Sequence, residues 1–144
     1  MEAHLVGEDE EQARRFGWWP RRSGPEHFRA LLAEDEASWS CGGPNFRLAT
    51  RVRGELVGGC ELRVRAPGSA TVSYWTFAPH RGRGYATRAT RLLCDWAFEA
   101  LRLERIEAHV EEDNPASLGV ARAAGFVGTP RRDDQGLLVL ERRG

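Results

Sequence analysis

The chain has 144 residues, which is enough for one domain with a substantial hydrophobic core. Its 21 basic and 21 acidic residues cancel, so a large basic field of the kind that binds nucleic acid is not expected. No apolar run approaches the roughly 20 residues that cross a bilayer, so no membrane partner is expected either.

The N-terminal composition and the cysteines indicate a cytoplasmic protein without a metal. The first ten residues are acidic and lack the basic and apolar regions of a secretory signal. Cys41, Cys60 and Cys94 are widely and irregularly spaced, which is typical of neither a disulfide framework nor a metal site. All basic residues are arginine, and because codon usage in a GC-rich genome explains this, the arginines alone do not indicate nucleic-acid binding.

Residues 8–39 have a helical pattern. Acidic residues at 8–11 suit the start of a first helix, and Pro20 with the Ser-Gly-Pro at 23–25 ends it. Pro25 then opens a second helix, on which Phe28, Leu31 and Leu32 share one face.

From Asn45 the periodicity changes to that of strands. Three strands, at about 45–52, 56–64 and 70–77, are separated by glycine turns and predict an antiparallel meander. A long helix follows at about 85–101, with Ala89, Leu92, Leu93, Trp96, Ala97 and Ala100 as its expected buried stripe.

The remainder of the chain continues the alternation. It predicts a strand at 105–110, a helix at 115–124 that Gly125 caps, and two short strands at 126–127 and 137–140. The fold class is therefore α+β, or mixed α/β, with one central sheet.

A glycine loop joins the third strand to the long helix. In Ala-Pro-His-Arg-Gly-Arg-Gly-Tyr-Ala-Thr, residues 78–87, main-chain N–H groups and a helix N-terminus converge, which favours a phosphate. The dinucleotide fingerprint fails because Thr87 replaces its third glycine, and the lysine of a phosphate-binding P-loop is absent. The alternative interpretation is a tight turn with solvated arginines.

Residues 74–87 resemble the acetyl-CoA-binding segment of GNAT enzymes, and Arg-Gly-x-Gly-Tyr-Ala-Thr is especially similar to the RimJ/RimL-like branch. The resemblance implies a mixed, mostly antiparallel sheet with splayed middle strands and about four flanking helices. It also implies acetyl-CoA, or another short acyl-CoA, as co-substrate, with no metal. The implied coenzyme-binding residues are Thr76 and Phe77 for the pantetheine arm, Arg81, Gly82, Arg83, Gly84, Tyr85, Ala86 and Thr87 around the pyrophosphate, and Asn114 and Ser117.

A second segment supports the resemblance. Residues 109–117, followed by Gly-Phe at 125–126, are similar to the second coenzyme motif of the family, so the resemblance covers about 45–140. It implies that Asn114 hydrogen-bonds the pantetheine, although an Asx-type helix cap explains the same residue. It also implies that Ser117 protonates or hydrogen-bonds the leaving thiolate; the alternative is a polar first-turn residue. Ala121 stands where many GNAT enzymes carry a catalytic tyrosine.

His109 is the candidate general base. An amine acceptor must lose a proton before it attacks, and an imidazole suits that step near neutral pH. Strand alternation places Glu107, His109 and Glu111 on one face, where either acid could orient the ring. The alternative interpretation is a structural histidine on a covered strand.

By the same resemblance, residues 1–44 form the acceptor side and 45–144 the CoA-binding core of one domain, 1–144. Only His4-Leu5-Val6 is available for the family's first strand, so that strand is expected to be short or missing. The acceptor side is then either more open than usual or completed by a partner subunit in a homodimer. Three tryptophans in the first 39 residues fit either an acceptor wall or core packing.

The resemblance thus predicts an N-acetyltransferase whose acceptor is a primary amine, either a protein N-terminus or a small molecule. Direct attack in a ternary complex is expected. A non-catalytic acyl-CoA sensor or scaffold is an alternative that the missing tyrosine permits, and an arginine-rich nucleic-acid module is a more remote one.

Overall fold

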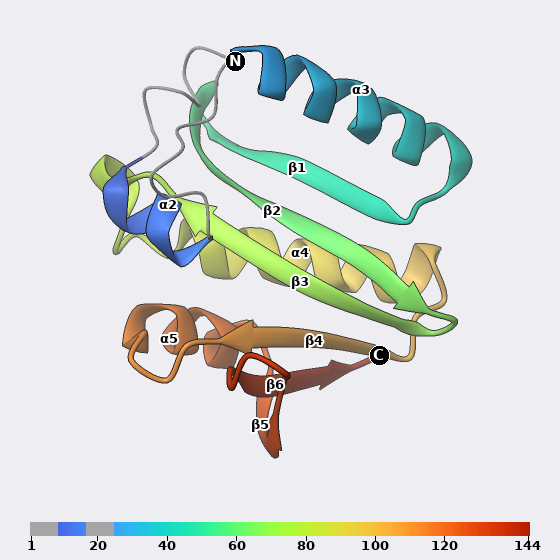
Figure 1. Ribbon diagram of the computed structural model, residues 1–144, viewed down its shortest axis with the longest axis vertical. Helices are drawn as coiled ribbons and strands as arrows, with labels where there is room; N and C mark the ends of the chain where they lie inside the picture. Colours follow the sequence, from blue (N-terminus) through green and yellow to red (C-terminus); the bar gives the residue numbers. More distant parts are fainter. Residues whose placement is uncertain (1–8, 17–24) are drawn as a thin grey trace.

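The computed structural model describes residues 9–16 and 25–144 (Figure 1). The predicted first strand at 4–6 and the tryptophans at 18 and 19 lie outside the described residues. Within them the helices and strands are, in chain order, α2 (Glu10–Arg15), α3 (Pro25–Cys41), β1 (Asn45–Val52), β2 (Glu55–Ala66), β3 (Ser69–Thr76), the 3-10 turn η1 (Ala78–His80), α4 (Tyr85–Ala100), β4 (Arg105–Val110), α5 (Pro115–Ala123), β5 (Val127–Arg132) and β6 (Leu138–Arg143).

The described strands form one six-stranded sheet in the order β1-β2-β3-β4-β6-β5. All neighbouring pairs are antiparallel except β3 and β4, which are parallel and are joined through α4. The predicted meander, the mixed and mostly antiparallel sheet, and the helices around it are therefore confirmed.

The two parallel strands separate part-way along their length. Their register runs from Ser69↔Arg105 to Val72↔Ala108 and ends there, although both strands continue (Figure 1). The predicted splay of the middle strands is thus confirmed, and it opens a gap between the last residues of β3 and of β4.

The long helix α4 packs on β2 and β3, and its buried face differs by part of a turn from the prediction. Thr90, Leu93, Cys94 and Ala97 are buried, at helical spacings of three and four residues. Leu92, which was predicted to be buried, is 70% exposed because it lies about a quarter of a turn away from that stripe.

The second predicted helix, α3, packs along β1, and here the predicted apolar face is only partly correct. Leu32 is 54% exposed, Leu31 is half-buried, and the side chain of Phe28 lies outside the described residues. The contact of α3 with the core is instead made toward its end, where Trp39 packs edge-on to Phe46 with ring centroids 4.9 Å apart.

Both ends of α5 follow the sequence closely. Asn114 caps its start by accepting a hydrogen bond from the Ser117 N–H at 3.1 Å, and Pro115 occupies its first turn. At its end Gly125 has φ +97, and the Phe126 N–H donates to the Ala121 carbonyl, which is the six-residue closure of a glycine-capped helix. These caps fix the first turn of α5 beside the gap between β3 and β4.

Candidate active site

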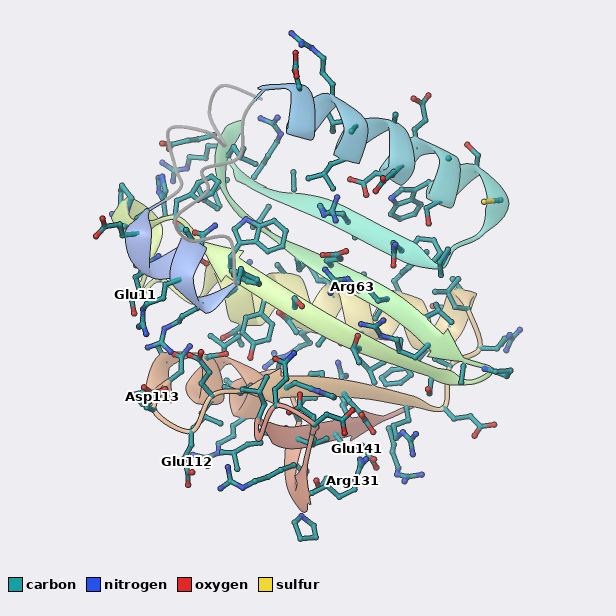
Figure 2. The ribbon with its side chains drawn as sticks, viewed as in Figure 1. Glu11, Arg63, Glu112, Asp113, Arg131 and Glu141 are labelled. Carbon is teal, nitrogen blue, oxygen red and sulfur yellow. The ribbon has the colours of Figure 1, made fainter. Side chains whose placement is uncertain are left out.

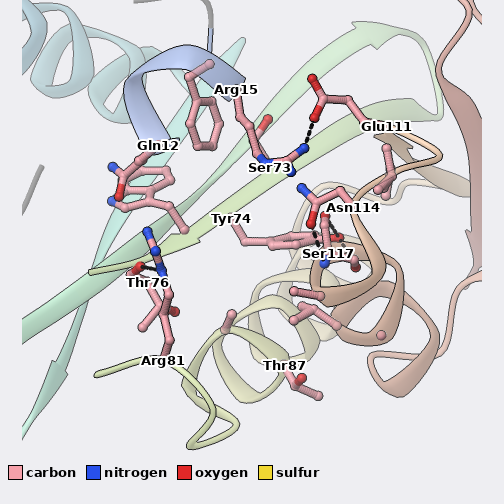
Figure 3. Close-up of a pocket in the computed structure, with 18 of the residues that line it drawn as sticks. Gln12, Arg15, Ser73, Tyr74, Thr76, Arg81, Thr87, Glu111, Asn114 and Ser117 are labelled. Atoms are coloured by element: carbon pink, nitrogen blue, oxygen red, sulfur yellow. Dashed lines mark hydrogen bonds and ion pairs between the residues drawn. The ribbon is translucent and has the colours of Figure 1, made fainter. Parts of the chain in front are cut away.

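A cavity of about 670 Å³ occupies the gap between the splayed strands (Figure 3). The end of β3, the glycine loop, the end of β4 and the first turns of α5 all contribute to its lining. Of the residues predicted from the sequence, the following line it: Thr76, Arg81, Gly82, Arg83, Gly84, Tyr85, Ala86, Thr87, His109, Asn114 and Ser117. The fold therefore brings both sequence motifs to one place.

Phe77 is the predicted site residue that the fold keeps out of the cavity. Its side chain is only 2% exposed, and its N–H donates to the Val57 carbonyl of β2 at 2.9 Å. In an antiparallel pair the hydrogen-bonding direction alternates, so the N–H groups of Tyr74 and Thr76 face the gap instead. The main-chain N–H groups that face the gap therefore belong to Thr76 and Tyr74, whereas that of Phe77 is bound within the sheet.

The glycine loop supplies main-chain donors at one end of the cavity. Gly82 and Gly84 have φ +73 and +75, a left-handed conformation that glycine adopts without strain. Gly84 is the N-cap of α4, and the first helical bond there is from the Arg88 N–H to its carbonyl. Within the described residues, the N–H groups at 82–87 have no main-chain acceptor. Such a group of donors suits an anion.

Arg81 is held by neighbouring groups. Its Nε donates to the Thr76 carbonyl at 3.0 Å, and its guanidinium pairs with Asp9 at 2.7 Å and with Glu11 at 3.7 Å. The loop is thereby tied both to the end of β3 and to α2.

Two hydroxyl groups meet on the side of the cavity formed by α5 (Figure 3). The Tyr74 hydroxyl lies 3.0 Å from Ser117 Oγ and 2.9 Å from the Ser117 carbonyl oxygen. Burial raises the pKa of Tyr74, a rise that its hydrogen bond with Ser117 only partly offsets. Ala121, at the position where the resemblance implies a tyrosine in many relatives, is fully buried. The tyrosine hydroxyl that contacts Ser117 comes instead from Tyr74 on β3.

His109 is held between two carboxylates. Its Nδ1 lies 2.8 Å from Asp133 and its Nε2 lies 3.2 Å from Glu107. Which nitrogen donates depends on the tautomer of the ring, and each nitrogen has a carboxylate oxygen as its partner. Because both ring nitrogens already have carboxylate partners, the geometry favours the structural interpretation of His109.

The carboxylates respond to these contacts. Burial raises the pKa of Glu107, but hydrogen bonds from Arg131 and His109 outweigh it, and its pKa is lowered. Burial likewise opposes the lowering of the pKa of Asp133, which hydrogen bonds from His109 and from two N–H groups of its own turn produce. Arg131 and Glu141 lie close together beside this cluster (Figure 2).

The short helix α2 covers the cavity from the side opposite α5 (Figure 3). Gln12, Arg15 and Phe16 line the cavity, and Arg15 pairs with Glu111 on the loop after β4. These contacts were not predicted, because a six-residue, mostly charged helix carries no signal of which distant loop it contacts.

The described residues contain no cluster of His, Cys, Asp and Glu suited to a metal ion, and none of their helices is long and apolar enough to span a membrane. None of the cysteines lines this cavity. Burial raises the pKa of Cys60 to about 11 and that of Cys94 to about 12, whereas Cys41 is exposed.

Comparison with known proteins identifies the family. The family model for the acetyltransferase (GNAT) domain matches residues 2–127. The chain belongs to the GNAT acetyltransferase family. A probable N-acetyltransferase of Bacillus subtilis, YjcK, is 43% identical over 58 residues, which are 40% of this chain and 32% of that protein. The match thus spans about a third of the length of this curated relative.

Solved structures of acetyltransferases share the fold. An acetyltransferase from Agrobacterium tumefaciens has a TM-score of 0.76 at 25% identity, covering 99% of this chain and 84% of that chain. RimJ from Mycobacterium smegmatis, in complex with CoA-disulfide, has a TM-score of 0.71 at 25% identity over 83% of this chain and 62% of that one. The predicted resemblance to the GNAT superfamily and to its RimJ/RimL-like branch is confirmed.

Proposed function

We propose that this GNAT protein is an acyl-CoA-dependent N-acyltransferase that moves an acetyl group from acetyl-CoA to a primary amine. The observation that carries the proposal is one cavity that combines two features: main-chain donors with no main-chain acceptor among the described residues at one end, and a pair of hydroxyl groups at its side. The donors suit a pyrophosphate, and the gap between β3 and β4 suits an extended arm.

The proposed coenzyme contacts follow the cavity. The N–H groups of residues 82–87 hold the pyrophosphate, assisted by Arg81 and Arg83. The main-chain groups of Tyr74 and Thr76 bind the pantetheine, and Asn114 approaches it from the other side of the gap. Acetyl-CoA is a co-substrate here, and no metal takes part in the proposed reaction.

In the proposed reaction the amine attacks acetyl-CoA directly, with both bound in a ternary complex. The neutral amine attacks the thioester carbon, the C–S bond breaks, and its electron pair goes to sulfur. Ser117 Oγ donates a hydrogen bond to the sulfur as charge develops there. We assign no base role to His109, because Asp133 and Glu107 engage both of its nitrogens.

The acceptor on this proposal is a protein N-terminus or a small-molecule amine. Support comes from the rim of the cavity, where the carboxylates of Glu11 and Glu111 lie beside Arg15 and offer acceptors to an ammonium. A cytoplasmic location and a homodimer that completes the acceptor side belong to the same proposal.

A thiol-release assay with acetyl-CoA and a panel of peptides, polyamines and amino sugars tests the proposal. We expect release that depends on both the enzyme and an amine. A coenzyme-binding sensor is the second candidate, favoured by the engaged His109 and by Ala121 in place of the family's tyrosine. Tight acetyl-CoA binding without turnover on any amine would replace the first function by the second.

A further inference from the structure

Tyr74 spans the gap that the splayed strands leave open. Its ring rises from β3, packs against the hydrophobic core, and carries the hydroxyl to the first turn of α5. There Ser117 is held on three sides, because its N–H is bound by Asn114 and its carbonyl and hydroxyl oxygens both lie within 3.0 Å of the Tyr74 hydroxyl. Both side chains line the cavity.

Two arrangements of the hydroxyl hydrogens satisfy this geometry. A carbonyl only accepts, so if Tyr74 donates to the Ser117 carbonyl, the serine hydroxyl donates to Tyr74. If Tyr74 donates to Ser117 Oγ instead, the serine hydrogen is available to the cavity. Only hydrogens rotate between these arrangements, and no heavy atom has to move.

We propose that Tyr74 is a positioning residue for Ser117: its hydroxyl donates to Ser117 Oγ and so directs the serine hydrogen toward the departing sulfur. The inference rests on the proposed function. A hydroxyl that accepts one hydrogen bond donates a stronger one, so the chain from Tyr74 through Ser117 to sulfur stabilises the thiolate better than serine alone.

Atoms and charges balance without a proton leaving either hydroxyl. The electron pair of the broken C–S bond goes to sulfur, and the thiolate takes a proton from solvent, which receives the one that the amine loses. Burial raises the pKa of Tyr74, so its hydroxyl keeps its hydrogen and remains a donor over the neutral pH range. In this way a side chain of β3 supports the leaving group from across the gap, although α5 carries Ala121.

Tyr74→Phe, Ser117→Ala and the double variant test the inference, because phenylalanine keeps the ring in the core and removes only the hydroxyl. We expect kcat to fall about 3- to 10-fold in Tyr74→Phe and about 100-fold in Ser117→Ala. The acetyl-CoA dissociation constant should change less than about twofold in each variant, since the Ser117 hydrogen bond is proposed to strengthen only as charge develops on the sulfur and the Tyr74 hydroxyl acts through Ser117.

The double variant separates positioning from a structural role. If Tyr74 acts through Ser117, adding Tyr74→Phe to Ser117→Ala leaves kcat unchanged. Thr129→Val is the matched control, because it also removes a single hydrogen-bonded hydroxyl, one that donates to the Val139 carbonyl at 2.8 Å outside the cavity. It should lose similar stability and keep its kcat. The inference would be overturned if Tyr74→Phe lowered kcat by the same factor in the wild type and in Ser117→Ala, or if Thr129→Val lowered kcat as much as Tyr74→Phe does.

A binding experiment makes the test independent of turnover. Thiolate absorbance of bound CoA, followed against pH, gives the pKa of the bound thiol. Without the hydrogen bonds that run from Tyr74 through Ser117 to the sulfur, the pKa of the bound thiol should rise by about 0.5 to 1 unit in Tyr74→Phe and at least as much in Ser117→Ala. An unchanged thiol pKa in Tyr74→Phe would refute the role of Tyr74, even in a protein that bound CoA and acetylated no amine.

Discussion

Replacing Gly82 by glutamate tests the proposed pyrophosphate site. Gly82 has φ +73, and a Cβ built there meets no heavy atom within 4 Å, so packing does not exclude a side chain. The left-handed conformation costs a non-glycine residue about 1 to 2 kcal/mol. The same conditions hold at Gly42, which has φ +78 and an equally open Cβ position.

The matched control is therefore Gly42→Glu. Gly42 belongs to the connection between α3 and β1, at the other end of the sheet from the start of α4 (Figure 1). Both variants carry the same new charge and the same backbone strain, so their losses of unfolding free energy should be similar. Only the variant in the glycine loop brings a carboxylate to the pyrophosphate.

The size of the effect follows from Coulomb's law. A carboxylate about 5 Å from one phosphate charge, at an effective dielectric constant of about 20, adds roughly 3 kcal/mol of repulsion, or about 150-fold in the dissociation constant. Calorimetry with acetyl-CoA measures this, and thermal unfolding of both variants checks their stability. Wild-type affinity in a folded Gly82→Glu variant would refute the assignment of the loop.

Three further predictions concern the ion pair of Arg81, the burial of the cysteines and the carboxylate contacts of His109. Asp9→Asn preserves the cap of α2, since aspartate and asparagine both accept a hydrogen bond from the Gln12 N–H, but it releases Arg81 from its ion pair with Asp9. Acetyl-CoA binding at low salt should tighten about two- to fivefold. Weaker binding would contradict the proposed role of Arg81. Alkylation of the native protein at pH 8 should modify Cys41 alone, because burial raises the pKa of Cys60 to about 11 and that of Cys94 to about 12. Mass spectrometry that shows rapid modification of all three thiols would contradict the burial of Cys60 and Cys94. His109→Leu removes hydrogen bonds that lower the pKa of its two carboxylate partners. The stability that these two carboxylates contribute is present above their ordinary pKa values of 3.8 and 4.5 and is lost as pH falls through the lowered pKa values. Chemical denaturation should therefore show a flatter loss of stability below about pH 4.5 in the variant. Parallel profiles in the variant and the wild type would refute the contacts of His109 with Asp133 and Glu107.

Local chemistry made much of the fold predictable. Pro115, Asn114 and Gly125 mark both ends of α5, and the alternation at 105–110 predicts β4 with the same bounds that the structure has. The glycine loop was equally predictable, because a loop with two glycines between a strand and a helix has few conformations available to it. In each case the determining residues are neighbours in the chain.

What depends on distant contacts was not predictable from the pattern. Leu92 and Leu93 are equally apolar, and only the packing of α4 on β2 and β3 decides that Leu93 is buried and Leu92 exposed. The direction of the Phe77 N–H depends on the register of β3 with β2. The Tyr74 hydroxyl finds Ser117 across 43 residues of sequence, a contact that no local periodicity encodes.

Calorimetric titration of the purified protein with acetyl-CoA, with dephospho-CoA and ATP as comparison ligands, tests the central claim most directly. We expect saturable binding of one acetyl-CoA per chain. ATP should bind much more weakly, because it lacks the pantetheine that the gap between β3 and β4 is proposed to hold. No binding at millimolar acetyl-CoA would contradict it, since the glycine loop would then be a turn and the cavity would not be a coenzyme site.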